Sequence, residues 1–284
     1  MPIDYDRLMA WKPDDVVQSY SSRDTMLYAL GLGLGSDPTD RNELRFTYEE
    51  GLQVLPTFPV VLGTPSTWWR ETGMVDWQHV VHGEQHLKLH ARFKPEGEVI
   101  GSTRVVDIID KGPGRGALLY TERSVRDAQT GELLATATST SFARKDGGFG
   151  GASGPTKEVH LLPDRAADFV FEHRTSPRAA LIYRLSGDYN PLHADPDVAE
   201  TAGFRQPILH GLCTYGVAAW AIVSEICEGI PGRLKSIGVR FSSPVYPGET
   251  LQTQMWVDKS VVSFRTRVIE RDVVVLNNGH AEII

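Results

Sequence analysis

Polar and apolar residues alternate along several stretches of the chain, which is typical of strands that bury one face. The first stretch is Glu84–Phe93, and a turn follows it at 95–98. Two longer runs come next, Val99–Ile109 and then Gly116–Val125, which continues past Gly131 to Phe142. The same pattern returns near the C-terminus and predicts strands at Leu234–Phe241, Leu251–Val257, Val261–Ile269 and Val273–Leu276.

Other segments have the boundaries and composition of helices. One helix is expected from Thr25 to Leu30, after the capping residues 22–24 and before a glycine-rich run that ends it. A short helix is expected at Arg178–Leu185, which a Ser-Pro pair precedes. A longer helix, rich in Ala, Val and Ile, is expected at Gly211–Glu228.

The second half of the chain repeats the plan of the first. A shift of about 150 positions superimposes Gly97-Glu98 on Gly248-Glu249. The glycine-rich segment 145–155 has no periodicity and is the best candidate for a linker. We therefore expect two copies of one α+β unit, at 1–151 and 152–284, whose sheets pair edge to edge.

Composition and charge exclude several classes of protein. The 284 residues carry 29 Lys+Arg against 36 Asp+Glu, a net charge of −7, which argues against a general nucleic-acid binder. A hydrophobic share of 41% is sufficient for a core. Cys213 and Cys227 lie in apolar segments and are interpreted as reduced core residues. With no apolar signal segment and no membrane span evident, a soluble intracellular protein is expected.

Histidines recur at four-residue intervals at His82, His86 and His90. On a helix, this spacing would suggest a metal site. On a strand the three share one face, but about 13 Å separates each from the next. The sequence therefore predicts no metal site here.

The segment 183–193 is the densest polar cluster in an otherwise apolar setting. Within it, Asp188, Asn190 and His193 lie on a loop that Pro191 stiffens. An acid, an amide and an imidazole together can hold a water molecule and move its protons. The alternative is an Asx-turn loop with a solvent-exposed histidine.

Gly211 starts the long helix of the second half. The first amides of a helix have no internal partners, and a glycine leaves room for a ligand to approach them. The Gly211 N–H is therefore a candidate donor to a developing oxyanion. The alternative is an ordinary helix start that happens to contain glycine.

Residues 183–193 and 203–213 together resemble the signature of the MaoC-like (R)-specific enoyl-CoA hydratase 2 family, and most closely the hydratase 2 unit of peroxisomal multifunctional enzyme type 2. The resemblance extends over nearly the whole chain, because further segments match the family pattern in order. These segments are 55–58, 82–85, 110–112, 147–151, 246–248 and 251–253.

The resemblance implies a double hot-dog fold of the α+β class, in which each half is a long helix wrapped by an antiparallel sheet. The C-terminal half would carry the catalytic loop. The N-terminal half, whose helix should begin within 56–75, would lack that loop and leave space for a bulky acyl chain. Bulky residues available to line that space are Trp68, Trp69, Met74 and Trp77.

The reaction implied is the reversible hydration of a trans-2-enoyl-CoA to a (3R)-3-hydroxyacyl-CoA. In that reaction Asp188 is expected to be the base that acts on water and His193 the proton donor to C2, although a coupled pair can share these roles differently. Asn190 would position the water, and the Gly211 N–H would bind the thioester oxygen. No cofactor or metal is expected beyond the coenzyme A of the substrate.

The resemblance also assigns binding and supporting residues. Contacts to the acyl-CoA are expected from His82, Gly83, Lys111, Tyr189, Pro191, Leu192 and Phe241. Glu49 stands where the family has a glutamate near the active site, and we expect it to form a buried ion pair with Arg184. A homodimer is expected, in a bacterial cytoplasm or, in a eukaryote, in a peroxisome.

Three other readings compete with the hydratase. A hot-dog thioesterase would direct water to the carbonyl carbon and release coenzyme A. A non-catalytic acyl-binding module would not need the intact set of Asp188, Asn190 and His193. A dehydratase that serves an acyl carrier protein would keep the same chemistry with a different carrier.

Overall fold

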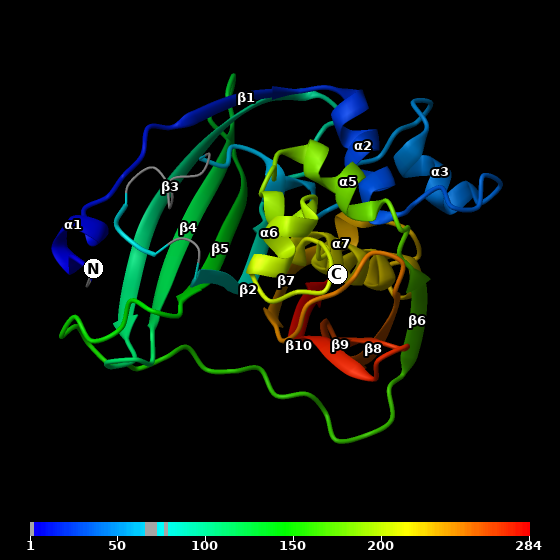
Figure 1. The fold of residues 1–284 in the computed structure, drawn as a ribbon. Coiled ribbons are helices and arrows are strands. Elements are labelled where there is room, and N and C mark those ends of the chain that lie inside the picture. Colours follow the sequence, from blue (N-terminus) through cyan, green and yellow to red (C-terminus); the bar gives the residue numbers. More distant parts are fainter. Residues whose placement is uncertain (1–2, 66–72, 77–78) are drawn as a thin grey trace.

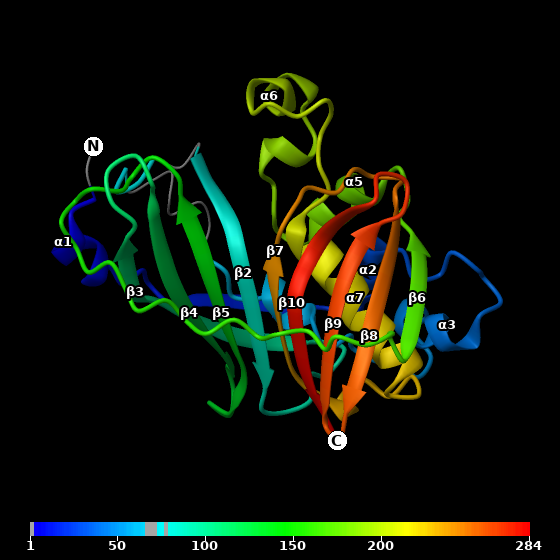
Figure 2. The ribbon, with the colours of Figure 1, turned by 90° about the horizontal axis from the view of Figure 1, so that it is seen from below.

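All ten strands lie in one sheet in the computed structural model, which describes residues 3–65, 73–76 and 79–284. The order is β1-β3-β4-β5-β2-β7-β10-β9-β8-β6, and every described pair is antiparallel (Figures 1 and 2). The N-terminal half contributes β1 (Val16–Tyr20), β2 (Val80–Leu89), β3 (Gly97–Asp110), β4 (Ala117–Asp127) and β5 (Leu133–Ala143). The C-terminal half contributes β6 (Phe169–Arg174), β7 (Leu234–Phe241), β8 (Thr250–Asp258), β9 (Val261–Val268) and β10 (Val273–Ile283).

The strands predicted from alternation are confirmed, but β2 begins and ends four residues earlier than expected and β10 continues to Ile283. The two edge strands were missed. Val17 in β1 is 61% exposed, and in β6 only His173 is buried. An edge strand with so little burial carries no alternating apolar pattern for sequence analysis to detect.

The two half-sheets join through β2 and β7, as expected. Their register runs from Glu84 opposite Arg240 to Lys88 opposite Ser236. An ion pair crosses the joint, because the Arg240 guanidinium lies 2.7 Å from a Glu84 carboxylate oxygen. The half-sheets therefore form one continuous sheet.

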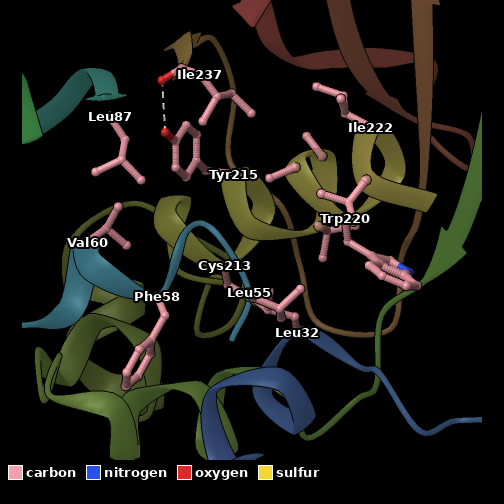
Figure 3. Packing of buried hydrophobic residues seen from close by; sticks show 14 of the residues in the cluster. Leu32, Leu55, Phe58, Val60, Leu87, Cys213, Tyr215, Trp220, Ile222 and Ile237 are labelled. Carbon is pink, nitrogen blue, oxygen red and sulfur yellow. Dashed lines mark hydrogen bonds between the residues drawn. The ribbon is translucent and has the colours of Figure 1, made fainter. Parts of the chain in front are cut away.

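The predicted long helix is α7 (Gly211–Glu225), and every residue from Cys213 to Val223 is buried. It packs on one face of the C-terminal half-sheet, where the Tyr215 hydroxyl donates to the Ile237 carbonyl at 3.0 Å (Figure 3). Both cysteines are buried and free, as expected of core residues.

The predicted first helix is α2 (Ser22–Leu32), which begins at the N-cap Ser21 and ends at Gly33, a residue with φ of 100°. It packs against α5 (Ala179–Tyr183) and α7, so it lies between the halves. Residues of α2, α7 and both half-sheets belong to one hydrophobic core. The other helices among the described residues are α1 (Tyr5–Met9), α3 (Arg41–Thr47), α6 (Pro196–Thr201) and the 3₁₀ helices η1 (Phe58–Val61), η3 (Arg184–Ser186), η4 (Pro191–His193) and η5 (Pro231–Arg233).

The segment 56–75, in which a helix is expected to begin, lies only partly within the described residues. Phe58–Val61 form the 3₁₀ helix η1, and residues 66–72 lie outside the described residues. Trp68, Trp69 and Trp77, expected to line an acyl pocket, also lie outside them. Met74 is partly buried against a second, smaller apolar cluster.

The glycine-rich segment begins a long connection, 144–168, that contains neither helix nor strand. This connection crosses the face of the sheet opposite α7 (Figure 2). Its Lys157 lies over the Tyr120 ring of β4, and the Asn278 side chain of β10 donates to the His160 carbonyl. The connection therefore spans both halves. No helix in the described part of the chain is long and apolar enough to cross a membrane.

Candidate active site

The loop that carries Asp188, Asn190 and His193 lies between α5 and α6, at the edge of the C-terminal half. Gly187 ends η3 with φ of 117°, a conformation that favours glycine. Asp188 Oδ1 accepts the Asn190 N–H at 3.2 Å, and Asn190 Oδ1 accepts the Leu192 N–H at 3.1 Å. Each side chain thus uses one oxygen to shape the loop. The second Asp188 oxygen and the Asn190 amide nitrogen remain available to a ligand.

His193 is buried, with only 8% of its surface exposed. The alternative of a solvent-exposed histidine on this loop is therefore wrong. Its Nδ1 lies 2.9 Å from the Ile208 carbonyl oxygen, and because a carbonyl can only accept, Nδ1 carries a proton. Burial lowers the pKa of His193 below its ordinary value, which favours the neutral ring. A neutral ring with its proton on Nδ1 presents a bare Nε2 as a proton acceptor.

The imidazole rings of His210 and His193 are stacked. The two ring centroids are 3.7 Å apart with an interplanar angle of 27°. His210 Nε2 donates to the backbone carbonyl of Asp188 at 3.2 Å. Burial, with the proximity of His193, lowers the pKa of His210 to about 3, so this ring is also neutral.

Gly211, the first residue of α7, follows His210 and adjoins Phe241. A Cβ at Gly211 would lie 3.1 Å from the Phe241 ring, so glycine allows this ring to pack against the start of the helix. The same ring contacts His82, with centroids 4.7 Å apart. Phe241 thus joins the helix start to β2 of the N-terminal half.

A β-bulge between His82 and Glu84 sets the position of His82. The bulge turns His82 toward Phe241, whereas the His86 ring contacts His280 at 5.5 Å. The expectation that these histidines share one face is therefore wrong, because an extra residue shifts the alternation. His82 Nε2 donates to the Glu84 carbonyl at 3.1 Å, and burial lowers the pKa of His82 to about 4.

Gly83 lies within that bulge. A Cβ at Gly83 would come within 3.1 Å of the Thr140 carbonyl oxygen, so the close approach of β5 favours glycine.

Lys111 lies at the turn between β3 and β4, at the same end of the sheet as His82 but three strands away. The neighbouring Asp110 carboxylate accepts three backbone N–H groups, from Gly112, Gly148 and Gly150. These bonds tie the turn to the glycine-rich segment and lower the pKa of Asp110. Lys111 therefore lies at the end of the sheet, in a different segment from the loop that carries Asp188.

The remaining loop residues expected to contact substrate are partly or largely exposed. Tyr189 is 58% exposed, Pro191 is exposed, and Leu192 is half-buried. They form the solvent-facing part of the loop.

The buried ion pair expected between Glu49 and Arg184 is absent. Glu49 is exposed just beyond α3, and no ion pair joins these two described residues. Arg184 instead lies over the Tyr189 ring at 5.1 Å and donates to the Tyr189 carbonyl at 3.4 Å. An exposed Glu49 has no desolvation cost to offset by pairing, so this expectation is wrong.

Asp188, His193 and His210 each offer a ligand atom within 4.8 Å of the others, the closest such group in the described part of the chain. A carboxylate with two imidazoles is a donor set that zinc or iron accepts. The same three groups can equally hold and orient a water molecule.

Two family models match the chain, one to each half. The MFE-2 hydratase 2 N-terminal domain matches residues 18–145, and the MaoC-like domain matches residues 158–278. Enoyl-CoA hydratase 2, peroxisomal, from Arabidopsis thaliana is 39% identical over 98% of this chain and 94% of its own length. The chain belongs to the MaoC-like enoyl-CoA hydratase 2 family. The resemblance inferred from the loop motif is thus confirmed.

Other members of this family are similar over most of the chain. 3-Hydroxyacyl-thioester dehydratase Y from Mycobacterium tuberculosis is 41% identical over 93% of both proteins. Peroxisomal multifunctional enzyme type 2 from Mus musculus is 37% identical, and there the match covers 94% of this chain but 37% of the relative.

Solved structures confirm the fold. A MaoC-like dehydratase from Phytophthora capsici superposes with a TM-score of 0.86, 37% identity and 98% coverage of both chains. A Mycobacterium tuberculosis protein described as having a double hotdog fold is 16% identical with a TM-score of 0.58, a likeness of fold alone. The expected double hot-dog is therefore confirmed.

Sequence reasoning did not assign a role to His210. The residue stands in the motif 203–213, directly before Gly211, and this position at a helix start is the only signal the sequence gives. Its stacking on His193 joins residues 17 positions apart, which only the fold brings together.

Proposed function

We propose that this protein reversibly adds water to the double bond of a trans-2-enoyl-CoA and forms a (3R)-3-hydroxyacyl-CoA. The observation that carries the proposal is the convergence of the Asp188 loop, buried His193 and the start of α7 at Gly211. Family membership supports the same reaction, because relatives over nearly the whole chain are named enoyl-CoA hydratase 2.

The resting site has no acidic proton on His193 to donate. Its single ring proton is on Nδ1, bound to the Ile208 carbonyl. The proton that reaches C2 must therefore come from the water. As the water oxygen bonds to C3, the bare His193 Nε2 accepts the water proton, either directly or from Asp188 after Asp188 has accepted it, and His193 then delivers that same proton to C2. Atoms balance, since the water supplies both the hydroxyl and the new C2–H.

Two further groups would complete this mechanism. The Asn190 amide is free to orient the water, because only its oxygen is used by the loop. The Gly211 N–H would stabilise negative charge on the thioester oxygen as the enolate develops, and one such donor typically contributes about 10²–10³ in rate. Neither role needs a redox group, so we propose no cofactor and no metal.

The substrate would extend from the loop toward the N-terminal half. His82 and Gly83 belong to β2, and Phe241 contacts both His82 and the start of α7, while Tyr189, Pro191 and Leu192 would border the entrance from the loop. Lys111, at the rim of the same sheet end, suits a coenzyme A phosphate. We propose that the N-terminal half (1–151) houses the acyl chain and that the C-terminal half (152–284) carries the chemistry.

Incubation of the wild-type protein with trans-2-decenoyl-CoA tests the proposal. We expect loss of the enoyl-thioester absorbance and a (3R)-hydroxyacyl-CoA product, with the same rate after dialysis against a chelator. Release of coenzyme A instead would indicate the thioesterase. No reaction across a panel of acyl-CoAs, with reaction on acyl carrier protein thioesters, would indicate the dehydratase. No reaction on either carrier would favour the binding module, and loss of the rate on chelation would indicate a metal at Asp188, His193 and His210.

The pH dependence of kcat/KM should identify the active form of His193. Burial places its pKa below the ordinary value of about 6.5, and the proposed mechanism needs the neutral ring. Activity should therefore be full above that pKa and fall as the pH drops through it, with a midpoint below about 6.5. The kcat/KM for hydration and the kcat/KM for dehydration should fall over the same pH range on the acid side. Activity that rises as the pH falls below 6.5 would show that protonated His193 is the active form.

For its assembly and compartment we propose a homodimer in a bacterial cytoplasm, or in a peroxisome if the source is eukaryotic. Relatives of both origins support this proposal, since one is from Mycobacterium tuberculosis and others are named peroxisomal. Light scattering during gel filtration measures the assembly directly.

A further inference from the structure

The proposed mechanism does not use His210, yet this residue contacts each part of it. His210 is 1% exposed, its Nε2–H donates to the Asp188 carbonyl, and its ring stacks on His193. Its own peptide carbonyl accepts the Cys213 N–H at 3.0 Å, as the N-cap residue of α7. One residue thus joins the loop and the proposed proton-transfer residue through its side chain, and the helix start at Gly211 through its backbone.

A second observation concerns the two ring nitrogens of His210, which differ in their hydrogen bonding. His210 Nδ1 is buried and has no hydrogen-bond partner among the described residues. An unsatisfied buried nitrogen costs about 1–3 kcal/mol, so a residue that served only to fill space would favour an apolar ring. The imidazole is explained by its other nitrogen, which supplies the donor that an apolar ring lacks.

We propose that His210 is a positioning residue for the hydration: it fixes the Asp188 loop through the backbone carbonyl and holds the plane of His193 by ring stacking. The inference rests on the proposed function. Its geometry is specific, because the bond holds the backbone of Asp188 and leaves the carboxylate free for water. The stack limits rotation of His193 about its Nδ1 bond to Ile208, which keeps Nε2 aimed in one direction.

The charge state of His210 agrees with a role in positioning. The titratable and charged groups that act on it are His193, Asp188 and Arg184. Burial, His193 and Arg184 lower the pKa of His210 and outweigh Asp188, which raises it, so the ring is neutral near pH 7. A neutral ring stacks on His193 without electrostatic repulsion. It also keeps Nδ1 unprotonated, so only Nε2 donates.

Two substitutions separate the hydrogen bond from the stack. His210→Phe keeps a ring beside His193 but removes the donor, whereas His210→Gln keeps a donor and removes the ring. We expect each to lower kcat about 10- to 100-fold with KM changed less than about threefold, because displacement by about 1 Å costs up to about 10² in rate. The acid limb of the pH profile should not move, because a neutral His210 does not titrate in that range.

His173→Gln is the matched control. His173 is also buried and also has an unpartnered ring nitrogen, but it lies on β6 against Gly33. We expect its kcat to equal that of the wild type. A double variant of His210→Phe with Asp188→Asn should lose less activity than the product of the two single losses, because His210 acts partly through Asp188.

Each outcome decides between distinct conclusions. Wild-type kcat in either folded His210 variant, or a kcat loss shared by His173→Gln, would overturn the role of His210 while leaving the hydratase in place. Loss or movement of the acid limb would show that His210 transfers protons, which also overturns positioning. A wild-type protein that does not hydrate enoyl-CoA would instead contradict the proposed function itself.

Discussion

Replacing Asp188 by asparagine should lower kcat for hydration by about 10²–10⁴, the usual contribution of a positioned acid–base group. Asparagine is isosteric, and its oxygen can still accept the Asn190 N–H that the carboxylate accepts now. The loop should therefore keep its shape, so KM and thermal stability should stay near the wild-type values. Steady-state kinetics on the enoyl-CoA, with a melting curve, measure both parts.

Asp195→Asn is the matched control for this prediction. Asp195 is an exposed carboxylate seven positions away that also accepts local backbone N–H groups, at the N-terminus of α6. It lies outside the hydrogen bonds that join Asp188, His193 and His210. If Asp195→Asn lost as much activity as Asp188→Asn, or if Asp188→Asn kept more than a tenth of the rate, Asp188 would not be the catalytic carboxylate.

The catalytic loop could be predicted from the sequence because its residues are nearly contiguous. Asp188, Asn190 and His193 lie within six positions, and Pro191 restricts the backbone between them. Local turns therefore bring these side chains together whatever the rest of the fold does. The strands and α7 were predictable for a similar reason, since alternation and composition are local signals.

Contacts between distant segments were not predictable from the same signals. The stack of His210 on His193 depends on the path of the chain between them, which bonds the Leu209 amide to the Val245 carbonyl. The pair of Glu49 and Arg184 was a hypothesis that combined the family position of Glu49 with the closeness of Arg184 to Asp188 in the sequence, and the structure places Glu49 in solvent. A motif identifies residue types, but burial decides which charges need partners.

The internal repeat gives a second example, in which two residues at matching sequence positions make different contacts. Glu98 and Glu249 occupy matching positions in the two halves, each after a glycine. Glu98 is exposed and accepts a bond from Ser19, whereas Glu249 is 7% exposed and binds an arginine. The repeat therefore preserves the strand plan and not the role of the residue.

Replacing Glu249 by alanine should be among the most destabilising single changes in the C-terminal half. Its carboxylate binds the Arg271 guanidinium through two bonds of 2.6 and 2.8 Å and also accepts the Tyr246 N–H at 2.8 Å. Removing one partner of a buried pair costs about 3–5 kcal/mol, because the remaining charge stays desolvated. Arg271 is 27% exposed, so we expect the lower end, about 3 kcal/mol of the free energy of unfolding.

We expect Glu249→Ala to affect the active site as well as the stability of the fold. The turn that contains Glu249 supports both of the segments that form the site. The Glu249 carbonyl accepts the Thr175 N–H ahead of α5, and the nearby Val245 carbonyl accepts the Leu209 N–H ahead of His210. Urea denaturation of Glu249→Ala measures the stability, and kcat at a temperature where the variant stays folded measures the site. Glu122→Ala, which breaks the exposed pair with Arg104, should cost less than about 1 kcal/mol and leave kcat unchanged. Equal costs for the two variants would show that burial does not set the strength of the Glu249 pair.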